Sequence, residues 1–491
     1  MTVNSPRTLR RAVLIASADR YTNMVIGFVL IAVVSRLLTP AQVGVSVIGT
    51  TAIALVEMIR DVPNTYLVQR PNLTRAAGRA AFSIMLVVSV LAAAALALSA
   101  PWISRMQGDP GVAQYLWVVA AALLLGPIER PPFALMRRNM EFGRIAAVNI
   151  ANVLTNAVVT IALAALGFGY MSFAWGVLAA SMASVILTTS LNPVPWIYRL
   201  HLADWREPVR LGAYSGAWGL VRKAMDAVPL IALGQQLNSI GNYGRAVVMS
   251  DIPDKLILAG VGPVAYPAIA AEHNAGRSLK GPLLLALGYI TAVSWPAYLL
   301  LGCLAHPVVA LLLGPGWGEV VPLLQILVFA KLMLFFDPLI FSVLFIVGAL
   351  RTLVFSAVLP LPFFAVSALL LADYGPKAVA LCFLAVTPAY SIIGLACLRR
   401  AVRFTWGELL AVLGRSAGVT VACMAGPALL LASGLVPMEM SLVAALGIAA
   451  LAGLGWLLGL WIARHPLLAE MTRLFVALRV TFSNLPQRRS T

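Results

Sequence analysis

LGAYSGAWGLVRKAMDAVPLIALGQQLNSIGNYGRAVVMSDIPDKLILAGVGPVAYPAIA, residues 211–270, is an apolar stretch of two helix lengths that is interrupted by ionisable side chains. Those side chains are Arg222, Lys223, Asp226, Arg245, Asp251, Asp254 and Lys255. A membrane-crossing helix needs about 20 mostly apolar residues, and each charge inside it costs several kcal/mol unless it is paired or faces water. The stretch therefore predicts two transmembrane helices that line a pathway.

Composition places the chain among polytopic membrane proteins. Hydrophobic residues make up 61% of its 491 positions and charged residues 11%, whereas about one quarter of an ordinary globular protein is charged. The formal net charge of +17 would suit nucleic acid, but the arginines stand singly or in small groups between apolar runs, as topology-setting charges do. We therefore expect an all-α membrane protein that contacts membrane lipids and binds no nucleic acid.

Apolar runs separated by charged residues predict about 14 transmembrane helices. Their approximate ranges are 11–38, 41–60, 80–103, 112–133, 145–166, 171–193, 210–235, 242–270, 282–305, 321–348, 352–373, 376–398, 409–433 and 440–463. With the N-terminus in the cytoplasm, nearly all Lys and Arg residues between spans fall on the inner side, and only Arg36, Arg105 and Lys377 fall outside. This asymmetry follows the positive-inside rule and predicts that both termini are cytoplasmic.

An internal repeat divides the chain. SRLLTPAQVGVSVI, which starts at Ser35, joins the first two spans, and LGQQLNSIGNYGRAV, which starts at Leu233, joins the seventh and eighth. Both place a Leu, a short polar turn and a Gly before the next helix, and repeats of six helices that hold substrate between them are a known transporter plan. We expect two pseudo-symmetric six-helix lobes, residues 1–205 and 206–405, followed in residues 406–491 by two additional transmembrane helices and a cytoplasmic tail.

Ionisable residues inside the spans are the candidate functional residues. Asp19 and Arg20 lie at a depth in the first span similar to that of Arg222 and Lys223 in the seventh. Basic groups there would hold a phosphate or pyrophosphate, and we assign substrate binding to Arg20, Arg222, Lys223, Arg245 and Lys255. Acids in a low-dielectric site exchange protons near neutral pH, so the candidates for coupling to a proton or sodium ion are Asp19, Asp226, Asp251 and Asp337.

The same residues also allow a purely structural interpretation. Arg222 and Asp226 stand one helical turn apart, and so do Asp251 and Lys255. Ion pairs at this spacing would fix helix packing and would leave no charge in a cavity. The sequence leaves both interpretations open.

Proline and glycine patterns predict how the helices bend and pack. Prolines are concentrated in the second half, where we expect kinked or broken helices, with Pro253 and Pro338 as the best candidates for hinges. GWLLG, which starts at Gly455, predicts close packing of two helices.

No catalytic or cofactor motif is present in the sequence. It contains no Walker A, Rossmann or HExxH pattern. Its cysteines lie in apolar segments without CxxC spacing and are interpreted as buried thiols, not metal ligands: Cys303, Cys382, Cys397 and Cys423. The predicted outer loops are too short for the catalytic residues of a membrane glycosyltransferase, ligase or polymerase. We expect a transporter and not an enzyme, without cofactor or metal, energised by an ion gradient, the membrane potential or the substrate gradient.

Several loops and helix ends together resemble those of a known family. The segments are LVQRPNLTRAAGRAAF from Leu67, ALMRRNMEFGRIAAVNI from Ala134, ALGFGYMSFAWG from Ala165, NYGRAVVMSDIPDKL from Asn242, GPVAYPAIA from Gly262 and LLLGPGWGEVVPLLQIL from Leu311. They resemble the polysaccharide transport family, the Wzx-type oligosaccharide flippases of the multidrug/oligosaccharidyl-lipid/polysaccharide exporter superfamily. The resemblance covers about residues 10–400, and its one clear departure, Tyr170 after GFG, should alter only an outer turn.

The resemblance implies a flippase for undecaprenyl-pyrophosphate-linked oligosaccharide in the bacterial inner membrane, working by alternating access in exopolysaccharide, capsule or O-antigen synthesis. It implies a lipid-linked oligosaccharide as substrate and the polysaccharide polymerase machinery as a partner, and it supplies no catalytic residues. A MurJ-type lipid II flippase and a multidrug/cation antiporter of the same superfamily are the alternatives. The basic cavity fits the first expectation because a pyrophosphate needs cations.

Overall fold

A computed structural model describes residues 6–70, 73–201, 203, 205–255, 269–434, 437 and 440–473. Throughout these residues the regular structure is helical and no strand occurs, so the expected all-α class is confirmed. The predicted tail beyond residue 473 and the centre of the eighth span, residues 256–268, lie outside the described residues.

Eight long helices occupy the described residues of the first half of the chain. They are α1 (Pro6–Leu37), α2 (Pro40–Gln69), α3 (Arg75–Gln107), α4 (Gly111–Arg138), α5 (Phe142–Ala165), α6 (Met171–Leu191), α7 (Arg206–Leu233) and α8 (Leu237–Ser250), with the short helix η1 (Pro195–Ile197) after α6. A capping box opens α2: the Thr39 side chain accepts from the backbone N–H of Gln42, whose side chain accepts from the backbone N–H of Thr39.

The second half contains shorter and interrupted helices. They are α10 (Lys280–Cys303), α11 (Ala305–Leu312), η2 (Pro315–Trp317), α12 (Val320–Met333), α13 (Asp337–Ile346), α14 (Leu350–Val358), α15 (Pro360–Leu370), η3 (Ala372–Tyr374), α16 (Pro376–Val402), α17 (Trp406–Ala432) and α18 (Leu442–Ile462). Breaks fall just before Pro338 and at Pro360, where proline lacks the N–H that would continue the helix. The expectation of broken helices in this half is confirmed.

Twelve helices in the described part of the chain are long and apolar enough to cross a membrane. They coincide with the first six and the last six predicted spans. The seventh and eighth are not among them: α7 carries several charges, and α8 ends at Ser250, before the residues outside the description. The multi-pass membrane architecture is therefore confirmed, and the total of 14 stays a prediction.

Contacts group the chain into two compact units, each assembled from separated segments. One contains Met1–Val248, Val309–Leu323 and Leu350–Tyr390, and the other contains Met249–Val308, Leu324–Ala349 and Ser391–Thr491. This grouping by contact does not test the lobe boundaries expected from the repeat, which stay a prediction.

In the first unit the two repeated turns pack directly against each other. A Cβ on Gly44, at the start of α2, would lie 2.2 Å from the carbonyl oxygen of Leu237, and one on Gly241, in α8, would lie 1.9 Å from that of Pro40. Only glycine permits this approach of two backbones. The repeat therefore marks a helix crossing.

The outer turn that contains Tyr170 is held by its own contacts. The Tyr170 hydroxyl donates to Asp109 Oδ2 at 2.9 Å, and its ring meets that of Tyr115 edge to face. Burial and the Asp109 carboxylate raise the pKa of Tyr170 to about 12, so the phenol is a neutral donor at neutral pH. The residue ties the α5–α6 turn to the α3–α4 turn.

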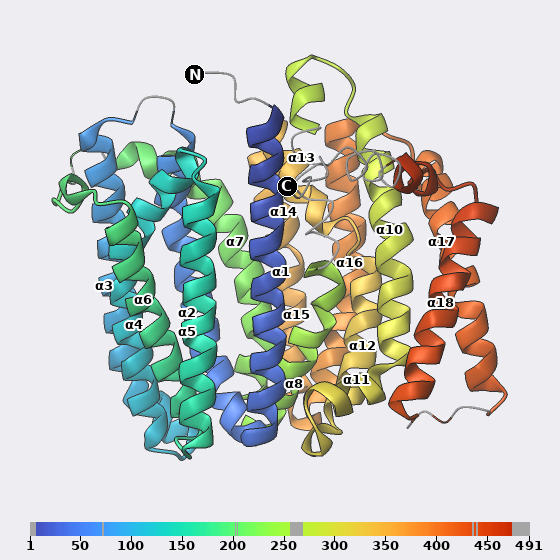
Figure 1. Ribbon diagram of the computed structural model, residues 1–491, viewed down its shortest axis with the longest axis horizontal. Helices are drawn as coiled ribbons and strands as arrows, with labels where there is room; N and C mark the ends of the chain where they lie inside the picture. The colour runs from blue at the N-terminus through green and yellow to red at the C-terminus, as the bar shows by residue number, and fades with distance from the viewer. Residues whose placement is uncertain are drawn as a thin grey trace, which may run out of the picture. The chain divides into compact units, whose positions relative to one another are not determined.

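In the second unit α10, α17 and α18 pack side by side (Figure 1). The Thr291 hydroxyl donates to Ser416 Oγ at 2.8 Å, which joins α10 to α17, and Trp456 Nε1 of α18 donates to the carbonyl oxygen of Ala292 at 2.7 Å. On α18, a Cβ at Gly455 would lie 2.5 Å from the carbonyl oxygen of Ala422. The close packing predicted from GWLLG is confirmed.

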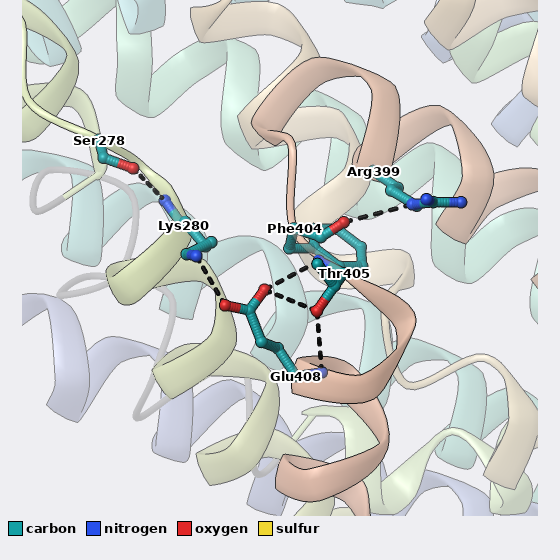
Figure 2. A network of polar contacts seen from close by, with 6 residues as sticks. All are labelled: Ser278, Lys280, Arg399, Phe404, Thr405 and Glu408. Carbon is teal, nitrogen blue, oxygen red and sulfur yellow. Dashed lines mark hydrogen bonds and ion pairs between the residues drawn. The ribbon is translucent and has the colours of Figure 1, made fainter.

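A polar network joins the starts of α10 and α17 (Figure 2). Thr405 and Glu408 form a capping box at the start of α17, and Lys280 Nζ donates to Glu408 Oε1 at 2.6 Å. Arg399 Nε donates to the carbonyl oxygen of Phe404, and its guanidinium lies 5.3 Å from the centre of the Trp406 ring. Glu408 therefore accepts from a backbone N–H at the helix N-terminus and also pairs with Lys280.

We predict that Gly455→Ala lowers the melting temperature of the purified protein in detergent. The added Cβ would meet a backbone oxygen of α17, and such overpacking costs about 1–3 kcal/mol. Gly453→Ala is the matched control, because a Cβ there has no neighbour within 4 Å and alanine is the better helix former. Equal melting temperatures for the two variants would contradict the packing.

We also predict a pH effect at His465, which follows the end of α18. Burial and the nearby Arg415 hold the pKa of His465 below its usual range, and its Nδ1 accepts from the backbone N–H of Leu467 at 3.2 Å. The stabilisation is present above the unfolded-state pKa of about 6.5 and is lost as the pH falls below it. Between about pH 7.5 and pH 5, melting of the native protein should fall further than melting of His465→Asn. Parallel curves would contradict the assignment.

Candidate functional site

Asp19 lies on α1 and is held by two amide groups. Asn23 Nδ2, on the same helix, donates to Asp19 Oδ1 at 2.8 Å, and Asn149 Nδ2 of α5 donates to Asp19 Oδ2 at the same distance. These bonds stabilise the charged carboxylate without a cation. The next residue, Arg20, is exposed near the middle of α1.

On α7 the predicted basic residues have different partners from those expected. Arg222 Nη1 lies 3.2 Å from the hydroxyl of Tyr390 on α16, with its guanidinium 5.5 Å from the centre of that ring. Asp226 pairs with Lys223 at 2.9 Å, and the two side chains are 55% and 38% exposed. The sequence left open a pairing of Asp226 with Arg222; Asp226 pairs with Lys223, three residues before it, which shares the same helix face.

Arg245 of α8 is buried in this conformation, with 8% of its surface exposed. Its guanidinium lies 5.8 Å from the centre of the Trp317 ring in η2, and Trp317 Nε1 donates to the carbonyl oxygen of Ser35 at 2.7 Å. Its neighbour Asn242 donates to Glu319 at 2.6 Å. The assignment of Arg245 to substrate binding stays a prediction, and the burial of this side chain does not support it.

In the second unit a lysine is shared by two aspartates. Lys331 of α12 pairs with Asp251 and, at 3.3 Å, with Asp254. Tyr298 of α10 interacts electrostatically with both aspartates and with Asp337. The sequence left open a pairing of Asp251 with Lys255; Asp251 pairs instead with a residue of another helix, and Lys255 is exposed.

The first unit also contains a partly open polar cavity of about 280 Å³ between α2, α4, α5 and α6. Its charged lining consists of Glu57, Arg60, Glu129 and Arg130. Arg130 Nη2 donates to Glu57 Oε1 at 2.6 Å, and Arg60 Nη2 lies 3.9 Å from the same oxygen. Sequence reasoning assigned both arginines to the inner ends of spans and did not predict this site.

Three asparagines of α5 complete one wall of the cavity. Asn149, Asn152 and Asn156 recur with spacings of three and four residues, so they share one face of the helix. Asn152 Nδ2 donates to Ser184 Oγ of α6 at 2.7 Å. This stripe of amides in an apolar span was the sequence signal that could have revealed the cavity.

No group of three or more His, Cys, Asp or Glu residues suited to a metal ion occurs in the described part of the chain. The four cysteines are free; Cys382, Cys397 and Cys423 are buried as expected, whereas Cys303 is half-buried. Among the candidate residues and around the cavity, charges of both signs thus meet on α7, around Lys331, and beside Glu57.

Comparison with known proteins gives low but consistent similarity. The chain is 22% identical over 308 residues to the lipopolysaccharide biosynthesis protein WzxC of Escherichia coli (strain K12). It is 23% identical over 311 residues to the succinoglycan biosynthesis transport protein ExoT of Rhizobium meliloti (strain 1021). Each match covers 62% of this chain and 62% of the relative.

Solved structures show the same fold over more of the chain. The lipid II flippase MurJ, in an inward closed conformation, gives a TM-score of 0.73 at 13% identity and covers 93% of this chain and 100% of its own. An inward-facing multidrug resistance MATE family transporter of the MOP superfamily gives 0.61 at 15% identity, covering 79% and 98%. The fold is therefore that of these transporters.

A family model provides the assignment. The model described as "Polysaccharide biosynthesis protein" matches residues 33–322, from the end of α1 into α12. This range contains the α2–α8 crossing, the cavity and most of the candidate residues. Because the match covers more than half of the 491 residues, the chain belongs to the polysaccharide biosynthesis protein family.

Proposed function

We propose that the protein is a flippase that moves undecaprenyl-pyrophosphate-linked oligosaccharide across the bacterial inner membrane for exopolysaccharide, capsule or O-antigen synthesis. The observation that carries the proposal is the exposure of charge at mid-helix. Arg20 is exposed near the middle of α1, and on α7 Asp226 is exposed and pairs with the half-buried Lys223. Charged groups at membrane depth avoid lipid because of their desolvation cost, so these faces border water.

A hydrated face of this kind suits an amphipathic cargo. A pyrophosphate needs cationic donors, and arginine presents several in a planar fork. Arg20 and Arg222 supply such donors on α1 and α7, and Tyr390 beside Arg222 adds a hydroxyl. Family membership and the names of the relatives, which include a transport protein for succinoglycan biosynthesis, support a saccharide cargo.

The same proposal covers location and partners. The protein acts as a transporter without a catalytic step, and the two ends of this chain face the cytoplasm, as the distribution of arginines favours. The cargo is supplied in the inner leaflet and is handed to the polysaccharide polymerase machinery on the outer side. Alternating access moves it, with hinges at the helix breaks before Pro338 and at Pro360.

A proton or sodium ion energises the movement, bound at the acidic cluster of the second unit. Asp251 and Asp254 pair with one lysine, Lys331. A surplus of carboxylates at membrane depth favours uptake of a cation. Asp19, by contrast, is already satisfied by two amides, which makes it the weaker candidate for coupling.

One alternative has specific support, because MurJ is the solved relative with a TM-score of 0.73. A lipid II flippase would carry a pyrophosphate-linked saccharide of the same general chemistry. The two functions separate in cells: loss of the protein removes a surface polysaccharide in the first case and stops peptidoglycan synthesis in the second.

For the cargo, we predict that Arg20→Ala combined with Arg222→Ala lowers translocation of a fluorescent lipid-linked oligosaccharide in proteoliposomes. Loss of two charge-assisted contacts, each about 1.5–3 kcal/mol, should reduce the rate at least tenfold. The double change to lysine keeps both charges and should retain much of the rate. Unaltered transport by the alanine variant would remove the basic pathway from the mechanism.

For the coupling ion, we predict that Asp254→Asn abolishes the acceleration of transport by a proton or sodium gradient but leaves transport without a gradient. The change keeps the Asp251–Lys331 pair and lowers the acidic surplus by one charge. Glu141→Gln is the control, since Glu141 precedes α5, outside the spans, and pairs with Arg144. A gradient response that persists in Asp254→Asn, or disappears equally in the control, would contradict this site.

A further inference from the structure

The cavity between α2, α4, α5 and α6 is built and is not an accidental void. Only 4% of the Arg60 surface is exposed, although this arginine lies in an apolar span. Its guanidinium fits where α4 has a glycine: a Cβ on Gly126 would lie 1.6 Å from Arg60 Nη1. Arg60 Nη1 also donates to the carbonyl oxygen of Leu123 at 3.4 Å. Two helices are thus shaped around one buried cation.

The charges that line the cavity sum to zero, and this balance indicates which class of ligand the cavity suits. Glu57 and Glu129 carry two negative charges, and Arg60 and Arg130 carry two positive ones. A pyrophosphate site needs a cationic surplus, and a site for a metal ion or proton needs an acidic one. A balanced set of ionised donors and acceptors suits a neutral ligand rich in hydroxyl groups, since each hydroxyl both donates and accepts.

The asparagine stripe offers further hydrogen bonds to such a ligand. Asn149 donates to Asp19, Asn152 donates to Ser184, and Asn156 Oδ1 accepts from Thr160 at 3.0 Å. Within the described part of the chain, these bonds engage one half of each amide. They leave Asn149 Oδ1, Asn152 Oδ1 and Asn156 Nδ2 for a ligand. These amide groups are uncharged donors and acceptors, so they too match hydroxyl groups.

The remaining lining provides an apolar face. Phe133 of α4 lies in the wall, together with Ile53, Val148 and Val177. A sugar ring has apolar C–H faces as well as hydroxyl edges, and an aromatic ring beside planar polar groups complements both. Small-molecule pockets usually measure about 300–1,000 Å³, so a cavity of about 280 Å³ holds one ring and not a chain.

We propose that this cavity binds one sugar ring of the transported oligosaccharide, separately from the arginines that hold its pyrophosphate. The inference rests on the proposed flippase function. Its lining comes from the middle turns of α2, α4, α5 and α6, so the cavity lies near the middle of these four helices.

The test compares two lipids on full-length protein in nanodiscs. One probe is lipid-linked oligosaccharide extracted from a strain that lacks the protein, and the other is undecaprenyl pyrophosphate, which has no sugar. Asn152→Leu with Asn156→Leu removes hydrogen bonds, and Ser181→Leu only fills the cavity and leaves these bonds in place. Thr155→Val is the matched control, a polar residue of α5 that does not line the cavity.

Both cavity variants should bind the oligosaccharide lipid at least about tenfold more weakly and the sugar-free lipid within about twofold of the native protein. The control should bind both as the native protein does. Unchanged binding of the oligosaccharide lipid, or equal loss for both lipids, would overturn the sugar site while the flippase function stands. Native protein that binds neither lipid would overturn the proposed function, and the sugar site with it.

Discussion

Charge at membrane depth is the constraint on which this structure depends. An ionised side chain inside a membrane-spanning helix must be paired, hydrogen-bonded or hydrated. Asp19 is satisfied by amides, Lys331 by two carboxylates, and Glu57 by two arginines. Lys223 and Asp226 pair with each other on α7, and Arg20 is exposed on α1. Each of these arrangements leaves a polar feature at membrane depth that an inert helical bundle would not need.

Close contacts between helices hold these charged side chains in place. Backbones approach at Gly44 and Gly241, and α17 and α18 approach at Gly455. At Gly126 of α4, the absence of a side chain leaves room for the Arg60 guanidinium in the cavity wall. Small residues at crossings bring helices together in membranes, where no hydrophobic effect does so. A site lined by four helices therefore keeps its geometry.

The sequence predicted the apolar helices far better than the partners of their charges. Twelve of the expected spans appear close to their predicted positions because hydrophobic length is a local property. The partners of Asp226 and Asp251 were predicted from helical spacing alone. For Asp251 the true partner, Lys331, is 80 residues away in sequence, and one sequence contains no sign of such a contact. The cavity was missed for a related reason: Arg60 and Arg130 matched the pattern of topology signals, and asparagines carry no charge.

The most direct test of the account is translocation by the purified protein. In proteoliposomes with a fluorescent lipid-linked oligosaccharide in both leaflets, a membrane-impermeant quencher first removes the outer signal. The account predicts that the protein then exposes the inner pool to the quencher, whereas a fluorescent phospholipid stays protected. An inner pool that remains protected, or exposure of lipid II in place of the oligosaccharide lipid, would contradict it.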